Sequence, residues 1–199
     1  MNDSAKEKVQ LLAHQTAKEG RQECGDAYYY KETDEYFICV VADGLGSGKY
    51  ANEASSAVVA AVEQYHGDDV ETLMNHCNKA LLQKRGAAVS IFKVYFKTRE
   101  FVYSCVGNIR FFLYSPSGKL TYPLPVTGYL SGRPQSFHTQ RFLYEPRSKF
   151  LIHSDGLHLQ GAKSLLKGFL PLELIANEIK SKYMTTSDDT TFIIGSLLQ

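Results

Sequence analysis

Four short acidic motifs stand beside apolar, strand-like runs, and they constrain the fold of this chain more than any other feature. They are Gly25-Asp26, Asp43-Gly44, Ser154-Asp155-Gly156 and Asp188-Asp189-Thr190. Asp43 and Asp155 follow runs of aliphatic residues, and Asp188 stands just before another. Carboxylates at the ends of separate strands can converge on one point, where Mg2+ or Mn2+ finds the oxygen ligands it prefers. We therefore predict a metal site that could activate water for phosphoester hydrolysis.

The size and charge of the chain limit what it can be. Its 199 residues suit one domain, residues 1–199, with a substantial core. The net charge is only +1, so we expect neither nucleic acid nor an anionic membrane as a partner. No apolar run reaches the length of about 18 residues that a membrane span needs, and residues 1–10 lack the core of a signal peptide. Four isolated cysteines, read as free thiols, fit a cytoplasmic protein.

Hydrophobic periodicity divides the chain into many strands and few helices. Strands are predicted at residues 7–17, 26–31, 36–42, 87–96, 100–106, 109–115, 138–144, 149–153 and 190–197. Helices are predicted at residues 50–65, from 68 to 81, and at 172–183, with the first two side by side. Residues 123–137, rich in proline, are predicted to form an irregular loop. This order favours an α+β fold with two antiparallel sheets over an alternating βαβ chain.

Asp43 is the strongest candidate for a metal ligand. An aspartate after a buried strand can bridge two cations with its two oxygens, and the carbonyl of Gly44 adds a backbone ligand. Each motif also has a simpler interpretation: Asp43 as a turn residue capping the helix near Tyr50, and Asp155 as an N-cap. The ordered set, rather than any single member, favours the metal site.

The ordered motifs resemble those of the metal-dependent, or type 2C, protein phosphatases, over nearly the whole chain. The matching segments are Gly25-Asp26, Asp43-Gly44-Leu45-Gly46, Gly86-Ala87-Ala88, Val106-Gly107-Asn108-Ile109-Arg110, Ser154-Asp155-Gly156 and Asp188-Asp189-Thr190-Thr191. The resemblance implies a four-layer α/β/β/α sandwich of two antiparallel sheets flanked by helices. It also implies a site for Mn2+ or Mg2+, with two ions, and hydrolysis of phosphoserine and phosphothreonine.

The chain looks closer still to the stand-alone members of this family in the bacterial sigma-B stress pathway. The segments that carry this likeness are Lys18-Glu19-Gly20, residues 42–48, Lys84-Arg85-Gly86-Ala87 and residues 123–132. The likeness implies phosphorylated stressosome scaffold proteins as partners and negative feedback on the stress response. The absence of an appended domain favours a monomer that recognises its targets through its own surface.

The resemblance assigns roles to individual residues. Asp43 would bridge both metals, Asp155 and Asp188 would complete the first, and the Gly44 carbonyl would bind the second. Asp26 would ligate directly or hydrogen-bond a water on the metal. Asp189 would support these ligands without touching a metal, and Arg21 would bind phosphate, although an exposed surface arginine explains Arg21 equally simply. Arg110, in a hairpin, is favoured as structural.

Two departures from the family pattern bear on the chemistry. Many relatives have an acidic ligand at the position of Gly25, so the second metal is expected to bind more weakly here. Many also have a histidine, proposed as a general acid, at the position of Leu45. His153 is a possible replacement, although a buried position at the end of a strand is favoured for it.

Direct hydrolysis by water is the predicted reaction, because no Cys-x5-Arg phosphate loop is present. A catalytically silent phosphoprotein-binding module is the alternative from another class. A metal nuclease or nucleotide hydrolase is a third possibility, against which the near-zero net charge argues.

Overall fold

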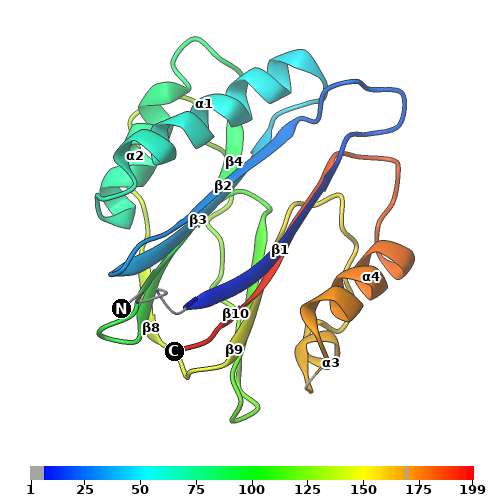
Figure 1. Ribbon diagram of the computed structural model, residues 1–199. Coiled ribbons are helices and arrows are strands. Elements are labelled where there is room, and N and C mark those ends of the chain that lie inside the picture. The colour runs from blue at the N-terminus through cyan, green and yellow to red at the C-terminus, as the bar shows by residue number, and fades with distance from the viewer. Residues whose placement is uncertain (1–6, 169) are drawn as a thin grey trace, which may run out of the picture.

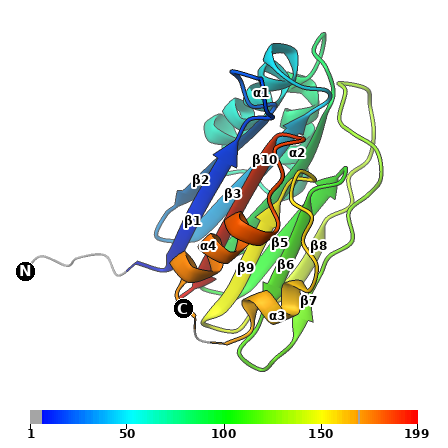
Figure 2. The same cartoon turned by 90° about the vertical axis from the view of Figure 1, so that its right-hand side faces the viewer.

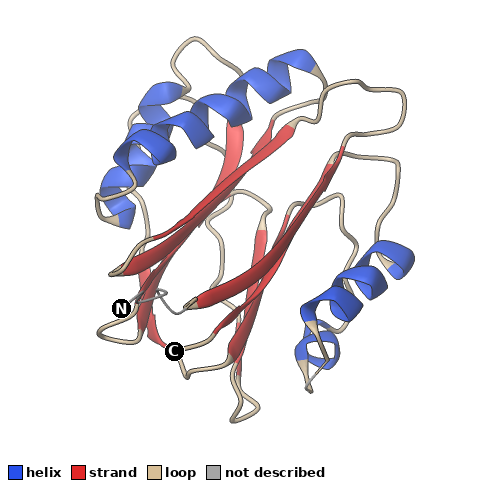
Figure 3. Cartoon of the chain, viewed as in Figure 1, coloured by secondary structure: helices blue, strands red, loops and turns tan. Residues whose placement is uncertain are grey.

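The computed structural model describes residues 7–168 and 170–199, so the first six residues of the polar N-terminal segment lie outside the description. Two five-stranded antiparallel sheets lie face to face, and a pair of helices covers the outer face of each sheet (Figure 1). Coloured by secondary structure, the strands form the two inner layers and the helices the two outer ones (Figure 3). The predicted four-layer α/β/β/α sandwich is therefore confirmed.

The two sheets contain strands from both halves of the chain. In the first sheet the order is β1 (Val9–Thr16), β10 (Thr190–Leu197), β9 (Ser148–His153), β6 (Arg110–Tyr114) and β7 (Leu120–Thr121). In the second the order is β2 (Asp26–Glu32), β3 (Tyr36–Gly44), β4 (Ala87–Tyr95), β5 (Glu100–Val106) and β8 (Gln140–Leu143). Every ladder is antiparallel, so strand ends that carry acidic motifs collect at one edge of the sandwich.

Strand β3 is buried on both faces, which explains its nearly continuous apolar sequence. Phe37, Cys39 and Val41 point into the core between the sheets. The alternating residues Ile38 and Val40 point to the opposite side, into the core beneath the helices. A strand that serves two cores has no polar face, so its first carboxylate comes only at its end.

Helices α1 (Lys49–Tyr65) and α2 (Val70–Ala80) pack side by side on the second sheet, as predicted. In α1 the buried residues, among them Ala51, Ala54 and Val58, recur at helical spacing. At the start of α2, Asp69 accepts a hydrogen bond from the backbone N–H of Thr72 at 3.0 Å. Among the described residues, no helix has the length and apolar character needed to cross a membrane.

The prediction of a single late helix is wrong. Two helices, α3 (Ala162–Leu166) and α4 (Leu172–Lys182), lie over the first sheet (Figure 2). Helix α3 has only five residues and no side-chain cap, so the sequence gives no periodic signal for it. Its Leu165 and Leu166 are buried against the same core as α4, which indicates that tertiary packing, not local propensity, stabilises it.

Candidate metal centre

The first two predicted ligands are brought together by the register of one strand pair. Asp26, the first residue of β2, lies directly opposite Asp43 near the end of β3. Asp26 is only 2% exposed, whereas Asp43 is partly open to solvent. The backbone N–H of Gly44 donates to the Gly25 carbonyl at 3.1 Å. A hydrogen bond therefore joins the Gly25-Asp26 and Asp43-Gly44 motifs at this edge.

A serine joins the opposite sheet to this pair. The Ser154 hydroxyl, just after β9, donates to Asp26 Oδ2 at 2.7 Å and accepts from the backbone N–H of Thr191 at 2.9 Å. This contact places Asp155, the next residue, at the same edge as Asp26. Asn108 in turn donates to Asp155 Oδ2 at 2.6 Å. Neither Ser154 nor Asn108 was predicted to have a role, although both stand inside the acidic and hairpin motifs of the sequence.

Asp188 and Asp189 directly precede β10 and lie at the same edge of the sandwich as the other acidic motifs. Asp188 Oδ1 accepts from the backbone N–H of Asp189 at 2.9 Å. Asp189 is 4% exposed, and its Oδ1 accepts from the backbone N–H of Lys18 at 2.9 Å. Asp189 therefore fixes the segment that leads into Asp26, and its support of the metal ligands stays a prediction.

Three glycines at this edge leave no space for a side chain. A Cβ on Gly44 would lie 2.0 Å from the Ala51 carbonyl oxygen, and one on Gly156 would lie 2.2 Å from the Asp189 carbonyl oxygen. A Cβ on Gly25 would lie 2.6 Å from Asp189 Oδ2. The Asp189 carboxylate thus fills the space that a side chain at position 25 would need. This contact is a physical reason for the missing acidic residue at Gly25.

The carboxylates destabilise one another's charge. Burial, followed by repulsion from Asp26, Asp155, Asp188 and Asp189, raises the pKa of Asp43 to about 8. Burial raises the pKa of Asp26 to about 6, despite the opposing hydrogen bonds from Ser154 and Thr191. The pKa of Asp155 is also raised, by burial and by Asp188. A positive ion at this edge would relieve the repulsion that these shifts report.

The donor set fits a hard divalent cation that keeps part of its water. Asp26 Oδ1 and Asp189 Oδ2 are buried without a hydrogen-bond partner in the described part of the chain. Within residues 7–168 and 170–199, no three His, Cys, Asp or Glu side chains are arranged as a finished metal-ligand group. Mg2+ does not need such a cage, because it binds through one or two carboxylates, backbone carbonyls and several waters. Asp43, Asp155, Asp188 and the Gly44 carbonyl can supply these ligands.

Two arginines lie beside the glycine-rich loop that follows β3. A Cβ on Gly48 would be 3.9 Å from Arg21 Nη1, so the predicted phosphate-binding residue lies against this loop. Arg85, which was not a predicted site residue, donates to the Leu45 carbonyl at 3.3 Å and lies over the ring of Tyr50. Basic groups therefore border the acidic centre on the side of the loop.

His153 is a core residue at the end of a strand, as favoured from the sequence. It is 2% exposed, and its Nδ1 donates to the Ser154 carbonyl at 2.7 Å. Burial lowers the pKa of His153 to about 4, so the imidazole is neutral near pH 7 and carries no proton to spare for a leaving group.

Comparison with known proteins decides the family. Residues 33–194 match the family described as Stage II sporulation protein E (SpoIIE). The chain belongs to the SpoIIE family. The match includes the segments around Asp43, Asp155 and Asp188, whereas Arg21 and Asp26 lie outside the matched residues.

A relative of this SpoIIE-family chain aligns with nearly all of it. Phosphoserine phosphatase RsbX of Bacillus subtilis strain 168 is 48% identical over 191 residues, which cover 96% of each sequence. A crystal structure of RsbX in complex with magnesium aligns with a TM-score of 0.91 at 48% identity, covering 95% of each chain. The enzyme class predicted from the sequence is confirmed: this member of the SpoIIE family is a metal-dependent protein serine/threonine phosphatase.

Two further solved structures share the architecture of this SpoIIE-family chain. One, from work on the bacterial stressosome as a modular system adapted to control secondary messenger signalling, aligns with a TM-score of 0.86 at 29% identity. That alignment covers 95% of this chain and 100% of the other. The PP2C phosphatase domain of SpoIIE from Bacillus subtilis aligns with a TM-score of 0.79 over 96% of this chain and 63% of the other. At 16% identity, the second likeness shows the fold alone.

Proposed function

We propose that this phosphatase hydrolyses phosphoserine and phosphothreonine on stressosome scaffold proteins in the cytoplasm, and so provides negative feedback on the sigma-B stress response. The proposal is supported by the 48% identity to a phosphoserine phosphatase across nearly the whole chain. A structural neighbour from the bacterial stressosome supports the choice of target. The chain acts as a monomer on these proteins.

One observation carries the chemistry: Asp26 and Asp43 lie opposite each other at a strand edge where burial raises the pKa of both. Asp43, Asp155, Asp188 and the Gly44 carbonyl would hold two Mg2+ or Mn2+ ions. Bound there, the ions would supply positive charge that polarises the phosphoryl group and lowers the pKa of water, so that water loses a proton near neutral pH. The residues of the chain hold this arrangement in place before the substrate arrives.

The remaining residues orient the reactants. Asp26, fixed by the Ser154 hydroxyl through Oδ2, keeps Oδ1 available to accept a proton from the attacking water. Arg21, beside the glycine-rich loop, would pair with oxygens of the phosphoryl group. Water attacks phosphorus in line with the leaving serine or threonine oxygen, and no phosphoenzyme forms. Leu45 cannot transfer a proton, so the leaving oxygen takes its proton from water.

The test is phosphate release from a phosphoserine protein and from a small aryl phosphate, each with Mn2+, with Mg2+ and with EDTA. Asp43→Asn should reduce release more than about 100-fold, because it removes a ligand rather than a supporting group. Asp34→Asn is the matched control, because Asp34 is exposed and, among the described residues, its carboxylate pairs only with Lys8 at 3.9 Å. Release that survives EDTA, or survives in Asp43→Asn, would contradict the mechanism. A folded protein that binds phosphoprotein without releasing phosphate would favour the silent module.

A further inference from the structure

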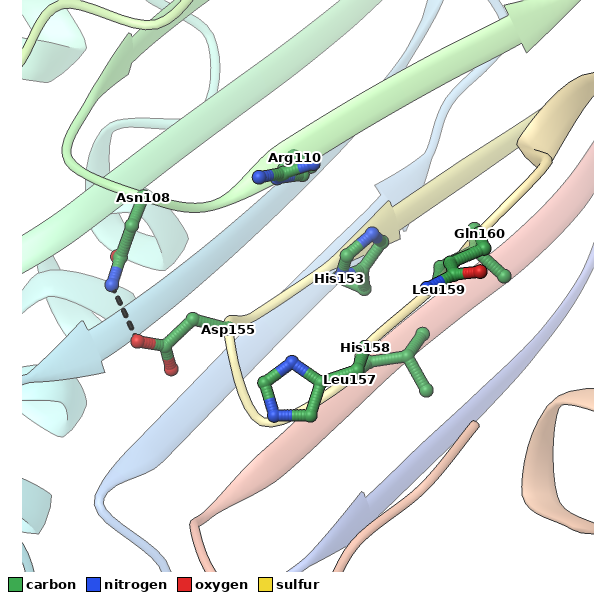
Figure 4. A pocket seen from close by; sticks show the side chains of 8 residues that line it. All are labelled: Asn108, Arg110, His153, Asp155, Leu157, His158, Leu159 and Gln160. Atoms are coloured by element: carbon green, nitrogen blue, oxygen red, sulfur yellow. Dashed lines mark hydrogen bonds between the residues drawn. The ribbon is translucent and has the colours of Figure 1, made fainter. Parts of the chain in front are cut away.

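A cavity of about 420 Å3 opens beside the metal centre, on the outer side of the β6 and β9 strand ends (Figure 4). Asn108, Arg110, His153, Asp155, Leu157 and His158 are among the residues that line it. Its volume lies within the range of about 300–1,000 Å3 that is usual for ligand sites. Because Asp155 belongs both to this cavity and to the predicted ligand set, a group bound here would lie next to the reacting phosphate.

The lining offers hydrogen-bond donors and one free cation. Arg110 lies opposite His153 in the β6–β9 ladder, so the two side chains emerge on the same face of the sheet. The Arg110 side chain is exposed, and within the described residues it has neither an ion pair nor a side-chain hydrogen bond. The sequence favoured a structural role for Arg110, and the exposed, unpaired guanidinium leaves it available to a ligand as well.

The acidic side chain in the lining, Asp155, already accepts a hydrogen bond from within the protein. Asp155 is the single carboxylate among the described residues that line the cavity, and its Oδ2 accepts the Asn108 amide. Figure 4 shows Asn108 directed at Asp155, with Arg110, His153 and His158 around the same space. His153 Nε2 is buried and so presents no acceptor to a ligand, whereas the exposed Arg110 guanidinium has no anionic partner among the described residues. The cavity as a whole suits an anionic group of a peptide.

We propose that this cavity is a specificity pocket, in which Arg110 pairs with an acidic side chain that flanks the phosphorylated residue of the substrate. This proposal rests on the proposed function, because it assumes that a phosphopeptide segment lies across the metal centre. Arg110 suits the role because its guanidinium forms a bidentate pair with a carboxylate and stays charged at every relevant pH. Arg110 is then a residue that selects substrate and takes no part in the reaction at phosphorus.

The test uses a series of phosphoserine nonapeptides in which one Glu is moved through the flanking positions, each paired with the Gln peptide. We expect wild type to favour Glu at one or two positions by about three- to tenfold in KM, with little change in kcat. Arg110→Gln should bring this Glu-to-Gln ratio close to one. Arg147→Gln is the matched control, because Arg147 is exposed and lies at the far end of β9. It should keep the ratio of wild type.

Binding of the same peptides, labelled for fluorescence anisotropy, is measured in parallel in the presence of Mg2+. A wild type that shows no preference for Glu, or an Arg110→Gln variant that keeps the preference, would contradict the proposed role of Arg110 in substrate selection. Failure of the proposed function has a different signature: no metal-dependent release from any peptide or from an aryl phosphate. In that case the anisotropy ratio still decides whether Arg110 selects an acidic side chain.

Discussion

Two groups of buried charge lie at opposite ends of strand β4, and they differ in how their charge is satisfied. At one end Lys93, paired with Ile38 and 1% exposed, donates to the carbonyls of His66, Gly67 and Asp68 at 2.8, 3.1 and 2.7 Å. These carbonyls follow the C-terminal end of α1, where a cation is favourable. The ammonium group also lies 4.2 Å from the ring centre of Tyr36.

At the other end, beyond Ala88, the carboxylates are not satisfied in this way. Asp43, the partner of Ala88, faces Asp26 and other carboxylates, and two buried carboxylate oxygens at this edge have no partner among the described residues. Burial of unpaired charge costs free energy, so a protein keeps it only where something else compensates. The comparison therefore separates a structural charge, complete within the chain, from a functional one that requires a ligand.

The largest expected effect on stability is at the satisfied end. Lys93→Met should lower the free energy of unfolding by about 2–4 kcal/mol, because three carbonyls lose their donor at once. Urea denaturation measures this change, with Lys119→Met, an exposed turn residue, as control. Equal stability of Lys93→Met and wild type would contradict a structural role for Lys93.

The stability of the metal-free protein should depend on pH because of the buried carboxylates Asp26 and Asp43. In the folded protein the pKa of Asp43 is about 8 and that of Asp26 is about 6, both above the ordinary value of 3.8. Between about pH 4 and 8 the folded state therefore holds more protons than the unfolded state. The free energy of unfolding in EDTA should therefore fall as pH rises through this window.

Unfolding in EDTA at pH 5, 6.5 and 8 checks this dependence, and Asp43→Asn should reduce the slope. Mg2+ at about 100 times its Kd should restore about 2.7 kcal/mol at pH 8. A metal-free protein that gains stability towards pH 8 would show that the carboxylates are compensated within the chain.

Asp189 has one satisfied and one unsatisfied oxygen. Oδ1 accepts from the backbone N–H of Lys18, whereas Oδ2 is buried without a partner among the described residues. Asp189→Asn keeps the acceptor but removes the negative charge, so Mg2+ affinity should fall about tenfold. Isothermal titration calorimetry measures the affinity, and Asp34→Asn serves as the exposed control. Unchanged affinity would restrict Asp189 to fixing the backbone of residues 18–25.

The smallest expected effect concerns Arg21, which lies beside the glycine-rich loop near the carboxylates. Arg21→Gln should raise KM for a phosphoserine protein about three- to tenfold, because an exposed arginine contributes only modestly by pairing with phosphate. Arg147→Gln, far from the edge, should leave KM as in wild type. An Arg21 variant with wild-type KM would make Arg21 an ordinary surface residue.

Much of the fold follows from local pattern. Runs of β-branched and aromatic residues bounded by turn residues predicted most of the strands. The helix predicted from residue 68 corresponds to α2, which begins at Val70 after the N-cap Asp69, because N-capping depends on neighbours in sequence. Helix α3 escaped prediction because five residues give too little periodicity, and its stability comes from leucines buried in a shared core. The candidate ligands were found for a similar reason: each stands where an apolar run begins or ends.

What the sequence determined by itself is which carboxylates stand at strand ends and which family their order matches. The tertiary structure decided how they are used: Ser154 reaches Asp26 from the other sheet, Asp189 fills the space beside Gly25, and Arg110 opens onto a cavity. Each of these contacts joins residues far apart in the chain, and its existence depends on strand register and sheet packing. Register and packing are set by the whole core, so no local pattern contains them.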